Sequence, residues 1–364
     1  MRKLWIFCLI VCSNQSFATP TSATKWHAEE VISGLGVPWG MAPIDQHQVL
    51  ITERNGRVGI LNHSTQKYQP IFHFPNVVTN GQGGLLDVAP SPFDDKAFYF
   101  TYSKEVEAGI ETALAKAYLV ENHIVGLTEL FVSSSGSTTN RHFGSRIAFD
   151  QYYLYLSIGD RGERENGQNL TTHAGSIIRL NPDGTPPKDN PFAEQNDAQN
   201  AIWSYGHRNP QGIIFLRDRN ELWSVEHGPR GGDEVNLIVK GANYGWPITS
   251  HGKEYWNPLP VGQAQEMKGI ESPKKVYIPS IAPSSMIYYQ GEQYPNLKNK
   301  LLLGALKLTH INILTLDAHG NIIEEQRILS DLKERIRALT VTPDGHILFS
   351  SDSGKVYRLS TLHE

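Results

Sequence analysis

The feature that most constrains the fold is a short hairpin phrase that the chain repeats. Each copy has two apolar runs of strand length, separated by a turn or an insertion. The three copies pair residues 49–52 with 57–61, 153–157 with 175–180, and 347–350 with 355–359. The first copy turns at Asn55-Gly56, a strong hairpin signal, and the last turns at Asp352-Ser353-Gly354. The phrase therefore predicts a fold of short antiparallel strands.

Further strand pairs fill the chain between these copies. They are 97–102 with 113–120, 212–216 with 221–225 across the polar turn 217–220, and 301–306 with 310–316. Counted this way, the chain holds about six four-stranded units, which predicts an all-β, six-bladed β-propeller of four-stranded antiparallel blades. The likeness of the first and last hairpins indicates that the two ends close the ring. A pair of β-sandwiches is the alternative.

Composition agrees with a single all-β domain over residues 19–364. The 32 glycines and 21 prolines imply many turns, and no long helical period or domain linker is present. Two stretches, 183–200 and 251–280, are rich in polar residues and proline and are expected to be long surface loops.

Residues 1–18 have the pattern of a secretory signal peptide. A basic start at Arg2 and Lys3 precedes an apolar core too short to span a bilayer, and Ser16 and Ala18 suit cleavage after Ala18. A membrane anchor is the alternative, and a lipoprotein at Cys12 is weaker because Val11 is large. We therefore expect a periplasmic or secreted protein with no membrane span after cleavage.

Charge and cysteine content narrow the function further. The formal net charge of −4 offers no basic footprint for nucleic acid. The only two cysteines, Cys8 and Cys12, lie within the expected signal peptide. The mature chain would then have no disulfide, so its stability must come from a large core, which its length allows.

Two turns rich in charge between Trp203 and Trp246 are the first candidate site. One is 207–210 and the other 227–234, and each adjoins a predicted strand of the same hairpin, so both reach one rim of a sheet. Asp233 and Glu234, with the carbonyls of the Gly228-Pro229 turn, form an oxygen ligand set of the kind that calcium accepts.

A second candidate is the pair His142 and Asp160. The histidine precedes a predicted strand and the aspartate follows the next one, which suits a general base and its orienting carboxylate if the fold joins them. A surface histidine without a partner is the alternative. The glycines around Gln82 would allow close backbone approach to a ligand, although a plain turn is the better explanation from this segment alone.

Three cations near the C-terminus form a third candidate. Lys307 follows a predicted strand, and Arg335 and Arg337 alternate, so they share one face if they lie in a strand. Together they suit an anion with several carboxylates, and solvated strand ends are the alternative.

These segments resemble the soluble quinoprotein sugar dehydrogenases, most closely the aldose sugar dehydrogenase branch. The motifs occur in the family's order between about Val31 and Leu359: GVPWGMA, GQGGLLDVA, HFGSR, SYGHRNPQG, EHGPRGGDE, NYGWP, GALK and RIR. The resemblance implies an exported six-bladed propeller that binds pyrroloquinoline quinone (PQQ) and Ca²⁺. It implies oxidation of an aldose at the anomeric carbon to the lactone, with hydride passing to the quinone.

The resemblance also implies roles for single residues. His142 matches the general base, Asp160 its orienting carboxylate, and Arg208 the cation beside the quinone oxygen. The cofactor contacts match Gln82, His142, Arg208, Asn209, Lys307, Arg335 and Arg337. The catalytic calcium matches the carbonyls of Gly228 and Pro229, and a second, structural calcium would fall on Glu234, Tyr244 through its backbone carbonyl, and Tyr255. Arg141 stands where the glucose-specific branch has an acid, which favours a broader aldose range.

Two other functions remain open from the sequence. One is a calcium-dependent lactonase or esterase on a propeller, which needs a central metal held by carboxylates. The other is a binding module without catalysis, since fold does not fix function. The electron acceptor is not identified, and the chain is expected to be a monomer or homodimer.

Overall fold

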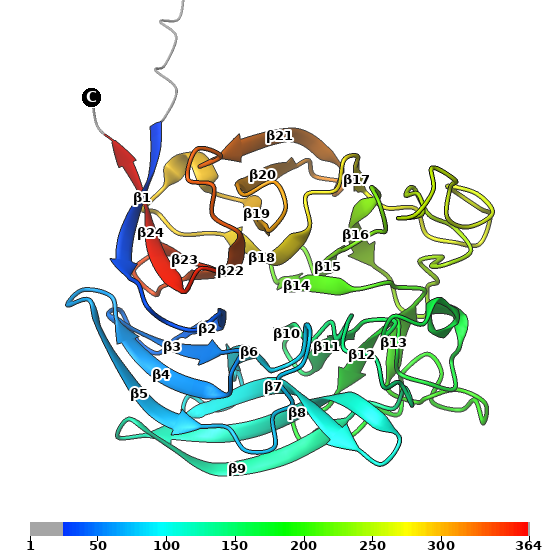
Figure 1. Ribbon diagram of the computed structural model, residues 1–364, viewed down its shortest axis with the longest axis horizontal. Helices are drawn as coiled ribbons and strands as arrows, with labels where there is room; N and C mark the ends of the chain where they lie inside the picture. The colour runs from blue at the N-terminus through cyan, green and yellow to red at the C-terminus, as the bar shows by residue number, and fades with distance from the viewer. Residues whose placement is uncertain (1–24, 363–364) are drawn as a thin grey trace, which may run out of the picture.

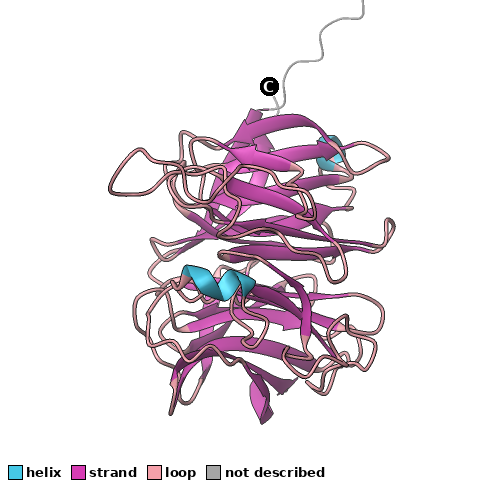
Figure 2. Ribbon diagram, turned by 90° about the vertical axis from the view of Figure 1, so that its right-hand side faces the viewer, coloured by secondary structure: helices cyan, strands magenta, loops and turns pink. Residues whose placement is uncertain are grey.

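The computed structural model of the protein describes residues 25–362, and the expected signal peptide lies outside them. Its 24 strands form six four-stranded antiparallel sheets arranged as blades around one axis (Figure 1). Turned by 90°, the molecule shows strands throughout with only short helical segments (Figure 2). The expected all-β, six-bladed propeller is confirmed.

The strands follow the chain blade by blade. Three blades are β2 (Pro38–Pro43), β3 (Gln48–Glu53), β4 (Arg57–Asn62) and β5 (Lys67–His73); β6 (Leu85–Pro90), β7 (Ala97–Val106), β8 (Gly109–Val120) and β9 (His123–Val132); β10 (Ile147–Phe149), β11 (Leu154–Ile158), β12 (Ser176–Leu180) and β13 (Ile202–Tyr205). Two more are β14 (Pro210–Leu216), β15 (Glu221–Glu226), β16 (Asp233–Ile238) and β17 (Lys275–Tyr277); β18 (Pro283–Tyr289), β19 (Lys300–Ala305), β20 (Ile311–Leu316) and β21 (Ile322–Ile328). The sixth holds β22 (Ile336–Val341), β23 (Ile347–Ser351), β24 (Lys355–Leu362) and β1 (Lys25–Ile32), and the short 3₁₀ helices are η1 (Arg164–Gln168) and η2 (Pro295–Leu297).

The sixth blade closes the ring with both ends of the chain. Strand β1 pairs antiparallel with β24, from Lys25 opposite Leu362 to Ile32 opposite Val356. In Figure 1 the first and last strands lie side by side. This confirms the closure expected from the two terminal hairpins.

The apolar core lies between neighbouring blades. Six clusters of buried residues each join two adjacent blades, for example Leu50 with Phe100 and Leu301 with Trp223. Because every blade buries both faces against a neighbour, the sheets form a ring and not the alternative pair of sandwiches.

One expected loop is partly wrong. The segment 251–280 contains β17, which pairs with β16, and the connection itself runs from 239 to 274. Strand β17 has three residues and lies on the outer edge of its blade, so it is too short to leave an alternating pattern. The other loop, 183–200, lies between β12 and β13 as expected.

No helix within residues 25–362 has both the length and the apolar character needed to cross a bilayer.

Candidate active site

The fold brings His142 and Asp160 together. His142 lies in the loop before β10, Asp160 follows β11, and the Nδ1 of His142 is 2.6 Å from the Oδ1 of Asp160. Both side chains are almost fully buried. Since Nδ1 faces the carboxylate, the Nε2 atom of the imidazole is the one left for a substrate proton.

The environment favours the neutral form of His142 and the ionised form of Asp160. Burial lowers the pKa of His142, and the charges of Arg208 and Arg141 lower it further against the opposing effect of Asp160. Burial alone would raise the pKa of Asp160, but the hydrogen bond and charge of His142 lower it overall. A neutral imidazole beside a carboxylate is the arrangement that a general base needs.

The second oxygen of Asp160 is bound by a residue that the sequence did not indicate. Trp246 donates its indole Nε1–H to Oδ2 at 2.7 Å, and the backbone N–H of Gly162 donates to Oδ1 at 2.7 Å. Trp246 belongs to the NYGWP turn of the long connection between β16 and β17. In the sequence, only the glycine and the proline of this turn indicated an unusual backbone conformation next to Trp246.

The backbone around His142 is fixed by close contacts. Its N–H donates to Oε1 of Gln82 at 2.7 Å, and the buried Arg161 donates to the carbonyl of Arg141. A Cβ at Gly159 would lie 2.2 Å from the carbonyl oxygen of His142, so this approach requires glycine. These contacts hold the loop in one position next to the reactive ring.

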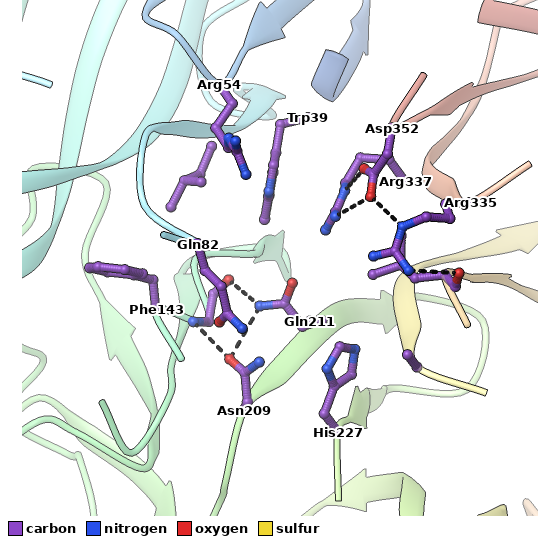
Figure 3. Close-up of a pocket in the computed structure, with 14 residues that line it drawn as sticks. Trp39, Arg54, Gln82, Phe143, Asn209, Gln211, His227, Arg335, Arg337 and Asp352 are labelled. Carbon is purple, nitrogen blue, oxygen red and sulfur yellow. Dashed lines mark hydrogen bonds and ion pairs between the residues drawn. The ribbon is translucent and has the colours of Figure 1, made fainter. Parts of the chain in front are cut away.

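A cavity of about 240 Å³ opens at this end of the ring (Figure 3). Polar and charged side chains from different blades face it together with the rings of Trp39 and Phe143. Its main polar lining residues are Arg54, Gln82, Asn209, Gln211, His227, Arg335, Arg337 and Asp352. Such a space suits a compact, planar, anionic molecule.

Asp352 organises the cationic side of the cavity. It binds Nε of Arg335 at 2.9 Å, and Nε and Nη2 of Arg337 at 2.7 and 3.0 Å, as Figure 3 shows. Burial would raise the pKa of Asp352, but the two arginines lower it overall. In the sequence, Asp352 stands out only as a turn residue. The expected third cation, Lys307, is exposed beside the lining residue Leu306.

Arg208 and Asn209 reach the same rim, as the paired turns predicted. The backbone N–H of Arg208 donates to Oε2 of Glu226 at 2.7 Å, and its Nη1 donates to the carbonyl of His227 at 3.2 Å. Within residues 25–362, its buried Nε has no hydrogen-bond partner. Asn209 accepts the N–H of Gly144 and a hydrogen of Gln211 through Oδ1, each at 3.3 Å.

A narrow space of about 10 Å³ lies beside Gly228 and Pro229, with Glu226, Glu234 and Tyr244 among its other lining residues. That is room for about one water-sized particle. Gly228 and Pro229 lie in the turn between β15 and β16. Among the turn and loop hydrogen bonds within residues 25–362, neither carbonyl accepts a backbone N–H. Burial and the charge of Glu226 raise the pKa of Glu234 to about 8. Free carbonyls and a carboxylate that lacks a counter-charge fit a hard cation such as calcium.

The other candidate ligands are Asp233, Tyr244 and Tyr255. Asp233 accepts the N–H of Gly228 at 2.9 Å and of Ala282 at 2.7 Å, so both its oxygens fix the loop. The hydroxyl of Tyr244 donates to the carbonyl of Leu237 at 2.6 Å. Tyr255 is 60% exposed on the neighbouring loop. No cluster of three or more His, Cys, Asp or Glu side chains suited to a metal occurs in residues 25–362.

The chain is similar to several known proteins. The protein-family model described as Glucose / Sorbosone dehydrogenase matches residues 35–358. The chain is 34% identical to aldose sugar dehydrogenase YliI of Escherichia coli, over 99% of this chain and 98% of that protein. It is 25% identical to quinoprotein glucose dehydrogenase B of Acinetobacter calcoaceticus, over 91% and 87% respectively.

A solved structure has a similar fold. The crystal structure of the soluble aldose sugar dehydrogenase from Escherichia coli in the apo-form superimposes with a TM-score of 0.88. The match covers 93% of this chain and 100% of that one at 33% identity.

Proposed function

The chain belongs to the glucose/sorbosone dehydrogenase family, and from this premise we propose that it is a PQQ- and calcium-dependent aldose dehydrogenase. The observation that carries the proposal is the buried His142–Asp160 pair, whose neighbours Gln82 and Phe143 line an arginine-rich cavity. The substrate is an aldose, oxidised at its anomeric carbon to the lactone.

His142 accepts the proton of the anomeric hydroxyl at Nε2. Asp160 fixes the ring through Nδ1 and stabilises the imidazolium that forms. Arg208, whose buried Nε is unpartnered within residues 25–362, supplies positive charge where negative charge develops.

The residues of the cavity fit PQQ, and the name of the Acinetobacter relative identifies that protein as a quinoprotein. Arg335 and Arg337, with Lys307 at the edge, would hold the cofactor's carboxylates. Gln82 and Asn209 would contact its polar groups, and Trp39 lies among the lining residues. When bound, PQQ supplies a quinone that accepts two electrons as hydride.

Calcium would bind the carbonyls of Gly228 and Pro229, where it would act as a Lewis acid. Glu234, with a backbone carbonyl at Tyr244 and a group at Tyr255, would hold a second ion. The absence of a carboxylate cluster within residues 25–362 gives the metal-dependent hydrolase no support. We also propose that residues 1–18 direct export to the periplasm or medium and that an external acceptor removes the electrons.

The test is a titration of purified apo-protein with PQQ and calcium, followed by an aldose while the quinone spectrum is recorded. Bleaching of the quinone to its reduced form is the expected result. Binding without bleaching by any aldose would refute the sugar substrate. Failure to bind PQQ would refute the PQQ-dependent dehydrogenase and leave the binding module without catalysis as the better interpretation.

A further inference from the structure

Trp256 is an exposed tryptophan close to the candidate active site. Its side chain is 74% exposed, and Tyr255 and Leu259 on the same loop are 60% and 61% exposed. Large apolar side chains grouped on a surface generally mark a place where something binds.

A small, well-bonded hairpin presents Trp256. The N–H of Glu254 donates to the carbonyl of Leu259 at 2.9 Å, and that of Val261 donates to Gly252 at 3.0 Å. Lys253 exchanges two backbone hydrogen bonds of 3.0 Å with Arg230, which lies in the site-forming turn after β15. The hairpin is therefore anchored to the rim of the site, and its tip carries Trp256.

Arg164 joins this tip to the catalytic pair. Its guanidinium carbon lies 5.7 Å from the ring centre of Trp256 and 5.6 Å from that of Trp246. Trp246 in turn donates to Asp160. The two terminal nitrogens of Arg164 bind the two oxygens of Glu254, each at 2.6 Å, which fixes the guanidinium between the two indoles.

This surface has the chemistry of a sugar-binding platform. A pyranose ring has an apolar C–H face, which packs on an indole, and hydroxyl groups at its edge, which need hydrogen-bond partners. The Arg164–Glu254 fork uses only some of the five guanidinium hydrogens and leaves carboxylate lone pairs available. A protein partner would also cover apolar residues, but the polar Arg164–Glu254 pair, which Trp246 links to Asp160, favours a carbohydrate.

We propose that Trp256 and the Arg164–Glu254 pair form a subsite for an outer hexose ring, so that the enzyme prefers the reducing ends of oligosaccharides. The inference rests on the proposed function, since the reducing-end ring must sit at His142. Trp256 is thus a specificity-determining residue for ring positions beyond the one oxidised.

The experiment compares maltotriose with glucose in the enzyme loaded with PQQ and calcium. In Trp256→Ala, the ratio of kcat/KM for maltotriose to kcat/KM for glucose should fall about tenfold, through KM. Trp256→Phe should restore most of the ratio, because it keeps an aromatic face. Tyr152→Ala, which removes a 64% exposed aromatic on the β10–β11 turn, is the matched control.

A direct titration separates this inference from the proposed function. Calorimetry of the enzyme loaded with calcium and fully reduced PQQ, which cannot accept a hydride, should show weaker binding of maltotriose to Trp256→Ala than to the wild type. An unchanged ratio, or equal losses on both sugars, would overturn the subsite. Failure of the wild type to oxidise any aldose would count against the proposed function. The calorimetric comparison would still show whether Trp256 contributes to sugar binding.

Discussion

Trp246 donates its indole hydrogen to the oxygen of Asp160 that does not face His142. The carboxylate therefore has a fixed orientation, and part of its negative charge is drawn away from the imidazole. The indole thus sets both the position and the strength of the catalytic pair.

Replacing Trp246 by Phe should alter the pH profile as well as the rate. Loss of the donor leaves more negative charge on Asp160, which stabilises the imidazolium and raises the pKa of His142. The acidic limb of kcat/KM should then move to higher pH, and kcat should fall about tenfold, as expected for losing a hydrogen bond to a charged group. Trp203→Phe is the control, because within residues 25–362 the buried Nε1 of Trp203 has no partner. An unshifted profile would contradict the role.

His142→Ala should retain PQQ binding and lose turnover by a factor of about 10²–10⁴. In the wild type, protonation of His142 removes the base as pH falls through its pKa. Because burial lowers that pKa below the ordinary 6.5, activity should persist through pH 6.5 and decline only in more acidic solution. Stopped-flow reduction of the bound quinone at several pH values measures this, and normal turnover in the variant would exclude His142 as the base.

The arginines of the cavity should determine cofactor affinity. Arg337→Gln removes a largely buried cation, so PQQ binding should weaken about 10–100-fold by titration. Lys307→Ala should also weaken binding, but less, because its ammonium is exposed. Arg327→Gln, a surface arginine on β21 paired with Glu325, provides the control. Equal affinities in all three variants would rule out the proposed orientation of the carboxylates.

The sequence predicted the blades well because their turns are local. Asn55-Gly56 forms the β3–β4 turn, and residues 217–220 connect β14 to β15. His142 and Asp160 were also predictable, since each flanks a strand of one hairpin and the antiparallel pairing brings those ends together.

Contacts that arrive from distant segments were not predictable. Trp246 reaches Asp160 from another blade, 86 positions along the chain, through a long connection without strand periodicity. Asp352 meets Arg335 and Arg337 only because β22 and β23 pair. Asp233 resembled a metal ligand because its chemistry suits one, and only the fold reveals that backbone N–H groups occupy both oxygens.

Calcium should stabilise the protein through Glu234. The half-buried carboxylate of Glu234 lies close enough to Glu226 for its pKa to be raised, so a bound cation would relieve their repulsion. Removing calcium with a chelator should lower Tm in the wild type. Glu234→Gln should lose most of this calcium-dependent difference, while Glu292→Gln, which alters an exposed carboxylate, should keep it. A full calcium response in Glu234→Gln would place the ion elsewhere.

Arg146 ties the blades together on the propeller axis. Its guanidinium binds the carboxylate of Asp87 in β6 at 2.8 Å. It also donates to three backbone carbonyls, those of Trp39 in β2, Gln211 in β14 and Ser284 in β18. A further bond of 3.0 Å reaches the carbonyl of Arg337 in β22. With its own position just before β10, this one side chain contacts all six blades.

Arg146→Met should therefore destabilise the fold by about 3–5 kcal/mol, because it leaves the buried Asp87 unpaired. Adding Asp87→Asn should recover part of the loss, since the uncompensated charge is removed while the orphaned carbonyls remain. Urea unfolding of the wild type, both single variants and the double variant closes the cycle. If the effects of the two changes were simply additive, the pair would not act as one unit.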